Sequence, residues 1–410
     1  MERYNIHQPI RFTSGMYRLN DEPNFNYQLN RLIHWNGGVL EDVKRVAPNI
    51  HNSADWKRAL ISLGNRAYKE NRIAPAIGYY RMSEFFMEDG DPDKLKYYKR
   101  ATAMFYAYYA AYFAGETPVI ERLSVPYEDI GLPVWHLRPV GEPKDTILLH
   151  GGNDSYMEEF LFSVLYLREC GFEVYLFEGP GQGGVVRTQG KHFTHEWERP
   201  VKAVLDHLHL QNVTIIGISL GGYLAPRAAA FDKRITKVIC WSVFPSFLGS
   251  VIGTQGKALE TAFYAMMKLR AKPLLNLVFG IKCKTDPMVN WAIRHGMYAY
   301  EASSPYDWAK KLERYDIRPV AHRLTQDVLI LGASADHFID YHKVSQEIDA
   351  MTNVRSLTFR LFTEQESAAN HCQVGNAKLA LDTIMNWISE TNRKNSTITN
   401  STAETLQSDR

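Results

Sequence analysis

Short apolar runs alternate with helical stretches over most of this chain, and this alternation narrows the possible folds more than any other feature. The apolar runs lie at residues 146–150, 172–177, 213–218, 328–331 and 357–362. Helical spacing follows each of them. Strands that alternate with helices favour a mainly parallel sheet, because each crossover helix packs back onto one of its faces. The chain is therefore predicted to be an α/β protein with helices on both faces of its sheet.

The first 115 residues show helical periodicity instead. Trp56, Leu60, Leu63 and Ala67 recur at the spacing of one helix face, and Ser53 is the expected N-cap of that helix. A second helix is expected near 73–87. Asp91-Pro92 supplies the N-cap and first-turn proline of a third, which should run to Gly115. These patterns predict an N-terminal helical domain at residues 1–116, followed by a catalytic α/β domain at 117–390.

The alternation breaks off between residues 243 and 326. Helical spacing at 258–270 and 287–300 predicts a helical lid inserted into the α/β domain. The last segment, 391–410, is rich in Asn, Ser and Thr and poor in large apolar residues, so we expect it to be disordered.

Composition excludes several function classes. The chain carries 47 Lys+Arg against 45 Asp+Glu, a net charge of +2, which argues against nucleic acid or an anionic membrane as a partner. The N-terminus lacks the apolar core of a secretory signal, and the apolar stretch 101–114 is shorter than the ~20 residues that span a bilayer. Four scattered cysteines without CxxC spacing support neither a disulfide framework nor a metal site. We expect a cytoplasmic protein without cofactors.

The strongest motif is Gly217-Ile-Ser219-Leu-Gly221, which directly follows an apolar strand and precedes a helix. A G-x-S-x-G turn in this context holds a serine on a tight, strained corner above the end of the sheet. Ser219 is therefore the predicted nucleophile.

A nucleophilic serine needs a histidine base and a carboxylate that orients the base. In proteins with this serine turn, the chain order is nucleophile, acid, histidine. Asp336 lies on the turn after the strand at 328–331, and His371 lies in the loop between the last strand and the last helix. His337 is a sequence neighbour of Asp336 and should point elsewhere, and His342 begins a helix. The predicted triad is Ser219, Asp336 and His371.

Two backbone amides should stabilise the oxyanion that forms during attack. One is expected from Leu220, the residue after the nucleophile. The other should come from the glycine-rich loop after the strand at 146–150, where Asn153 is the first choice and Gly152 the second.

A different glycine-rich loop, 179–184, has the G-x-G-x-x-G spacing of a dinucleotide-binding turn. Pro180 and the following VVRTQG sequence are not expected to open a helix, which that fingerprint requires. We therefore interpret this loop as structural.

Six segments together carry a family resemblance. They read DPDKLKYYKRA, VPYEDIGLPVWHLRP, HGGNDSYMEEF, FEGPGQGG, GISLGG and TEQESAANHCQVGN. With them, nearly the whole chain resembles α/β-hydrolases that carry an N-terminal helical domain. It is most similar to the family that contains bacterial 2,6-dihydroxypseudooxynicotine hydrolase and the fungal pigment and fusarin-cluster hydrolases.

The resemblance implies a serine hydrolase that tailors a polyketide or polyketide–peptide product in fungal secondary metabolism, by hydrolysis, chain shortening or ring closure. The bacterial relative cleaves a C–C bond next to a ketone, and a glutamate in the loop after the oxyanion strand assists it. The matching position here holds Asp154, one methylene shorter. A C–C hydrolase is therefore the alternative, with Asp154 as a candidate substrate contact.

The expected partner is a small hydrophobic substrate, held where helical segments meet the edge of the sheet. Aromatic residues of 101–114, Tyr109 among them, are candidates to line that pocket. The sequence leaves a homodimer open. Two further alternatives are a serine peptidase of the prolyl-oligopeptidase type and a non-catalytic binding protein. The helical N-terminal region, in place of a β-propeller, disfavours the first, and the complete predicted triad disfavours the second.

Overall fold

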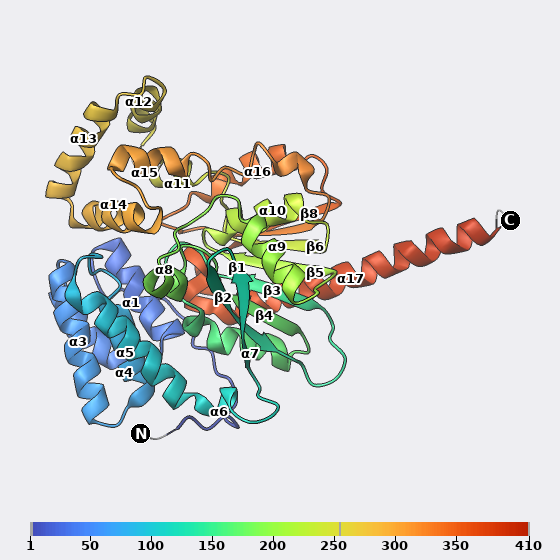
Figure 1. The fold of residues 1–410 in the computed structure, drawn as a ribbon, viewed down its shortest axis with the longest axis horizontal. Helices are drawn as coiled ribbons and strands as arrows, with labels where there is room; N and C mark the ends of the chain where they lie inside the picture. Colours follow the sequence, from blue (N-terminus) through green and yellow to red (C-terminus); the bar gives the residue numbers. More distant parts are fainter. Residues whose placement is uncertain (1–2, 254–255, 409–410) are drawn as a thin grey trace.

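The computed structural model describes residues 3–253 and 256–408, and its centre is one eight-stranded sheet (Figure 1). The strand order is β1-β2-β4-β3-β5-β6-β7-β8. β2 pairs antiparallel with both β1 and β4, and the remaining pairs are parallel. The predicted mainly parallel α/β fold is confirmed. The strands are β1 (Glu121–Tyr127), β2 (Ile130–Leu137), β3 (Thr146–His150), β4 (Glu173–Phe177), β5 (Val213–Ile218), β6 (Ile235–Trp241), β7 (Asp327–Ala333) and β8 (Ser356–Phe362).

Helices cover both faces of this sheet. Ile215 of β5 packs in a core with α9 (Glu198–His207) and α10 (Gly221–Phe231). Its neighbour Ile216 joins the opposite core, with α7 (Leu161–Glu169) and α17 (Ala377–Ser408). Successive side chains of a strand point to opposite faces, so a strand covered on both sides must be apolar throughout. This requirement explains the continuous apolar runs in the sequence.

The N-terminal region forms α1 (Pro23–Trp35), α2 (Leu40–Val46), η1 (Ala47–Asn49), α3 (Ser53–Lys69), α4 (Ile73–Ser83), α5 (Pro92–Tyr108) and α6 (Ala110–Phe113). They enclose a separate core that includes Trp56. Three details differ from the sequence-based expectation. The cap of α3 is Asn52, whose side chain accepts a hydrogen bond from Asp55 N at 2.9 Å, and not Ser53. The third expected helix ends at Tyr108, and α1 and α2 were not predicted.

The segment between β6 and β7 is helical, with α11 (Phe247–Gly253), α12 (Lys257–Lys268), α13 (Lys272–Thr285), α14 (Pro287–Ala299), α15 (Pro305–Leu312) and η3 (Ala321–Arg323). We call this segment the lid. In Figure 1 the lid lies above the N-terminal helices, with α14 nearest to them. Trp291 of α14 stacks on Phe85 with ring centroids 5.2 Å apart, and its indole N–H donates to the Phe85 carbonyl at 3.0 Å. The lid therefore contacts the N-terminal helices directly.

The predicted disorder of 391–410 differs from the structure over 391–408, where α17 continues to Ser408 and projects from the molecule (Figure 1), and residues 409–410 lie outside the described residues. The first turns past residue 390 are held by tertiary contacts. Asn392 Nδ2 donates to Asp145 at 2.9 Å, and Asn395 Nδ2 donates to Asp327 at 3.1 Å. Hydrogen bonds of this kind are invisible to a composition argument. No helix in the described ranges is long and apolar enough to cross a membrane.

The loop at 179–184 also differs from expectation, because the residues after it do open a helix, α8 (Gly183–Gln189). The interpretation of the loop as structural now rests on Glu178. Its carboxylate accepts hydrogen bonds from Gly184 N at 2.7 Å and from Met157 N at 2.8 Å. A protein carboxylate thus occupies the end of the helix where a dinucleotide phosphate would bind.

The remaining short elements are η2 (Met157–Phe160), η4 (Tyr341–Lys343), α16 (Val344–Ala350), η5 (Glu364–Glu366) and η6 (His371–Asn376). Within α16, the fully buried Glu347 accepts a hydrogen bond from Phe244 N at 3.0 Å, close to where the lid leaves β6. Burial raises the pKa of Glu347 to about 8.

Replacing Glu347 with Gln should flatten the pH dependence of stability on the alkaline side. Folded Glu347 keeps its proton up to about pH 8, whereas the unfolded chain releases it near the ordinary value of 4.5. The free energy of unfolding of the native chain should therefore fall as pH rises between these values. Between pH 6 and pH 9, the free energy of unfolding measured in urea should fall by about 2–3 kcal/mol less in Glu347→Gln than in the native chain. The exposed Glu142→Gln is the control, and equal slopes in all three proteins would contradict the argument.

Candidate active site

The backbone at Ser219 adopts a left-handed conformation, with φ at 61°, between the end of β5 and the start of α10. Small neighbours make this turn feasible. A Cβ at Gly217 would overlap the Gly221 carbonyl, and one at Gly222 would overlap the Ser242 carbonyl. Ser219 N donates to Trp241 O at 3.1 Å, which ties the turn to the end of β6. The sequence motif therefore forms the strained corner that was expected from it.

The structure brings the three predicted triad residues together. Nε2 of His371 lies 2.8 Å from Ser219 Oγ, and Nδ1 lies 2.7 Å from Asp336 Oδ2. The other oxygen of Asp336 accepts hydrogen bonds from Phe338 N at 2.9 Å and Ile339 N at 3.1 Å. These two amides fix the carboxylate, which in turn fixes the imidazole, so the chain of hydrogen bonds ends on the serine hydroxyl.

The charge of His371 is set by this environment. Burial acts to lower its pKa, but the Asp336 carboxylate opposes that effect by its charge and its hydrogen bond, and the neighbouring Cys372 adds to the opposition. The net pKa of His371 is well above the ordinary 6.5. Asp336 therefore makes the imidazole a stronger base than a free histidine.

The two other late histidines have different surroundings. His337 packs its ring against Phe338 at 3.8 Å and Tyr27 at 5.2 Å, and burial lowers its pKa to about 4. His342 is exposed and lies 2.7 Å from Asp340 through its Nδ1. Of the three candidates, His371 is the one that bonds to Ser219.

The loop after β3 lies against the serine turn. A Cβ on Gly152 would stand 2.6 Å from Ile218 O and 2.8 Å from both Leu220 N and the Cβ of Ser219. The Gly152 amide, however, already donates to Ser155 Oγ at 2.8 Å. This bond argues against Gly152 as the second oxyanion donor, so Leu220 and Asn153 remain the candidate donors.

Helix α1 supplies two contacts that sequence reasoning missed. Tyr27 donates its hydroxyl to the carbonyl of His371 at 3.2 Å. One turn later, the buried Arg31 pairs with Asp154 at 3.1 Å and with Glu159 at 2.6 Å. The N-terminal domain thus touches both the histidine loop and the loop after β3. The apolar residues Phe25, Leu29, Leu32 and Ile33 recur on one face and could have indicated the helix, but no local signal identifies its distant partners.

The lid reaches the same loop. Tyr300, which caps the C-terminal end of α14, donates its hydroxyl to Asn153 Oδ1 at 2.8 Å. The side chain of Asn153 is therefore held from the lid side.

Tyr109 is not brought to this site. Its ring packs against Phe105 at 4.8 Å and Tyr4 at 5.1 Å, and it borders a cavity of about 180 Å³ between N-terminal helices and α7. The residues around that cavity include no member of the triad. The prediction of Tyr109 as a substrate contact therefore finds no support. The sequence shows which residues are aromatic, but it does not show which of them face the edge of the sheet.

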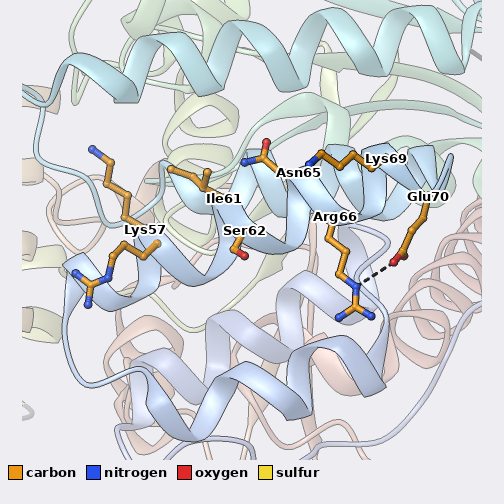
Figure 2. A pocket seen from close by; sticks show the side chains of 8 residues that line it. Lys57, Ile61, Ser62, Asn65, Arg66, Lys69 and Glu70 are labelled. Carbon is orange, nitrogen blue, oxygen red and sulfur yellow. Dashed lines mark hydrogen bonds and ion pairs between the residues drawn. The ribbon is translucent and has the colours of Figure 1, made fainter.

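A larger open hollow of about 590 Å³ follows α3 (Figure 2). Its lining comes from this helix alone, with Lys57 and Lys69 near its ends and an Arg66–Glu70 ion pair beside it. It lies on the outer surface of the N-terminal domain and contains no triad residue. Within the described residues, no three His, Cys, Asp or Glu side chains gather as a metal site would require.

Comparisons with known proteins agree with this geometry. Residues 147–373 match the model of the family described as alpha/beta hydrolase fold. The chain is 26% identical over 389 residues to the alpha/beta hydrolase psoB of Aspergillus fumigatus. The alignment covers 83% of this chain and 86% of the relative. It is 27% identical over 355 residues to the 20-hydroxy-prefusarin hydrolase FUS2 of Gibberella moniliformis, with coverage of 77% and 82%.

Among solved structures, 2,6-dihydroxy-pseudo-oxynicotine hydrolase superposes with a TM-score of 0.60 at 17% identity. The match covers 88% of this chain and 95% of that one. At this identity the likeness concerns the fold, and it includes the N-terminal helices as well as the sheet.

Substituting Gly152 with Ala should destabilise the folded chain. The new methyl group would press on the backbone of Ile218 and Leu220, which belong to the serine turn and cannot move freely. We expect a loss of about 1–3 kcal/mol in urea unfolding. Gly280→Ala in α13 is the matched control, because a Cβ there meets no atom within 4 Å. Equal stability of the two variants would show that the loop packs less tightly than described.

Proposed function

The chain belongs to the α/β-hydrolase family, and from this premise we propose that it is a serine hydrolase that works by acyl transfer through Ser219. One observation carries the proposal: the continuous hydrogen-bonded path from Asp336 through His371 to Ser219 Oγ. A serine hydroxyl is a weak nucleophile unless a base is poised to take its proton. Here the base, its orienting acid and the strained serine turn occur together.

In the proposed reaction, His371 takes the proton of Ser219 as Oγ attacks the substrate carbonyl. Asp336 keeps the imidazole in the orientation that presents Nε2 to the serine and stabilises the imidazolium that forms. The amides of Leu220 and Asn153 donate to the developing oxyanion. His371 then returns the proton to the leaving group, and water or a nucleophile within the substrate releases the acyl group from Ser219.

For the substrate, we propose a polyketide or polyketide–peptide product that is trimmed, hydrolysed or cyclised in fungal secondary metabolism. Support comes from the similarity to psoB and to FUS2, a relative named for hydrolysing 20-hydroxy-prefusarin. The aromatic side chains of Phe85 and Trp291 beside the Asn153 loop suit a largely uncharged substrate.

The C–C hydrolase alternative depends on Asp154. One of its oxygens is engaged by Arg31, while about a third of its side chain stays accessible beside Asn153. An acid–base role would compete with this ion pair, whereas a binding role would not, so the geometry favours acyl transfer. Cleavage of a β-diketone through Ser219 would leave an acyl-enzyme that intact mass spectrometry detects during slow turnover.

Ser219→Ala should abolish both ester hydrolysis and covalent labelling by a fluorophosphonate probe. His371→Ala should lower kcat by roughly 10⁴- to 10⁶-fold, because the serine then keeps its proton. The exposed His342→Ala is the control and should retain full activity. His337 is a poorer control than His342, since it packs against Tyr27. Undiminished labelling of Ser219→Ala would refute the assignment of the nucleophile.

The pH profile should identify His371 as the base. Its pKa is raised, and only the neutral form accepts a proton, so kcat/KM should rise with pH and have its midpoint above 6.5. Asp336→Asn removes the charge that opposes the effect of burial on the pKa of His371. The midpoint should therefore move to lower pH while kcat falls about 10⁴-fold. Asp340→Asn, next to exposed His342, should leave the profile unchanged. An unshifted midpoint in Asp336→Asn would mean that another group controls the profile.

A further inference from the structure

A small cavity of about 20 Å³ lies where the lid, the N-terminal domain and the Asn153 loop meet. His295 and Trp291 line it from α14, Phe85 from the turn just after α4, and Arg187 from α8. Asn153 borders the cavity and directly follows Gly152, which packs on the Cβ of Ser219. The cavity is therefore close to the serine turn and separate from the cavity beside Tyr109.

His295 is the unusual group in this wall. It is 8% exposed, and within the part of the chain that the structure describes neither of its ring nitrogens has a hydrogen-bond partner of good geometry, the Asn153 backbone making only a weak polar contact. Its ring stacks on Trp291, with an interplanar angle of 2° and centroids 5.4 Å apart. Trp291 is itself tied to the Phe85 carbonyl, so the imidazole is held at the cavity wall by a fixed neighbour.

The surroundings keep this imidazole neutral. Burial and the nearby charges of Arg187 and Lys94 hold the pKa of His295 well below 6.5, against a smaller opposing effect of the Asn153 backbone. A neutral imidazole offers one donor and one acceptor. The charged groups of the lining have partners of opposite charge: Arg187 pairs with Asp89 at 2.7 Å, and Asp154 pairs with Arg31 at 3.1 Å. His295 therefore adds an uncharged hydrogen-bonding group to the cavity.

Leaving a buried polar group without a partner costs about 1–3 kcal/mol. An apolar residue at position 295 would avoid that cost and would stack on Trp291 equally well. The imidazole of His295 therefore fits a cavity that is occupied by a hydrogen-bonding group during turnover.

We propose that this cavity is a substrate subsite that receives one uncharged oxygen substituent, a keto or hydroxyl oxygen, with His295 as its hydrogen-bond partner. The inference rests on the proposed function and adds the chemical class of the substrate. A volume of about 20 Å³ exceeds the ~10–15 Å³ that a single water-sized group needs but cannot hold a ring. Because Asn153 is also the proposed oxyanion donor, the bound oxygen lies a few carbon atoms from the carbonyl that Ser219 attacks.

The test uses p-nitrophenyl hexanoate together with its 4-oxo and 5-oxo derivatives, which move a keto oxygen along the same chain. The native protein should show a kcat/KM at least about tenfold higher for one oxo ester than for the unsubstituted ester, the value of one hydrogen bond. His295→Phe keeps a ring to stack on Trp291 and should abolish this preference while retaining activity on hexanoate. His295→Gln retains a donor and an acceptor and should keep part of the preference. The exposed His322→Leu is the control and should keep all of it.

The outcomes separate the two proposals. If fluorophosphonate labels Ser219 and the esters are cleaved without any preference for a keto group, the subsite is refuted and the hydrolase assignment stands. The subsite is also refuted if His295→Phe changes all three esters equally, since that result indicates a cavity filled by water or a purely structural histidine. If Ser219 is not labelled and no ester is cleaved, the proposed function fails, and the subsite fails with it. Should His295→Phe not fold, the native preference and its reduction in His295→Gln decide the question.

Discussion

The left-handed backbone of Ser219 is the constraint on which the rest of the site depends. A non-glycine residue in this conformation is strained, and it persists only when its surroundings enforce it. Here the enforcement comes from close backbone approaches at Gly217 and Gly222 and from the hydrogen bond of Ser219 N to Trp241 O. The same tight packing brings the Gly152 loop against the turn. The position of the nucleophile and the position of the oxyanion loop are thus consequences of one packing requirement.

A second constraint comes from the N-terminal domain. Arg31 is buried and pairs with both Asp154 and Glu159, so separating α1 from the sheet domain would leave uncompensated charges on both sides. Breaking a buried pair costs about 3–5 kcal/mol. One helical turn earlier, Tyr27 holds the carbonyl of His371. The helical domain is therefore part of the site architecture, because it fixes the histidine loop and the loop after β3 relative to each other.

Sequence patterns predicted the strands and the three triad candidates, which depend on local rules. They did not predict features that depend on tertiary contacts. Strand positions followed from apolar runs because both faces of the sheet are covered, and Ser219, Asp336 and His371 were found because each follows a strand. The backbone oxyanion donors were harder to predict. The Gly152 amide donates to the Ser155 hydroxyl, and this bond depends on a turn that residue spacing does not show.

Contacts between segments that are distant in the chain could not be predicted from the sequence. Tyr27 and Arg31 lie in a helix whose apolar residues do recur on one face, but their partners are more than 120 residues away, and helical spacing does not identify partners at that separation. Tyr109, between α5 and α6, packs among the rings of Tyr4, Phe105 and Phe162, an arrangement that the amino-acid pattern does not specify. The helix at 391–408 begins with hydrogen bonds to Asp145 and Asp327, and composition alone assigned that segment to disorder.

The Asn153 loop is the point where all these parts meet. Gly152 rests on the nucleophile turn, Asp154 is held by the N-terminal domain through Arg31, and Asn153 is held by the lid through Tyr300. A preorganised oxyanion donor must be fixed before the substrate arrives, because reorganising it during the reaction would cost free energy. Three consecutive residues anchored by three different parts of the chain meet that condition. In the proposed mechanism, the helical domain and the lid, which contribute none of Ser219, Asp336 and His371, would therefore act on the chemistry by holding this loop still.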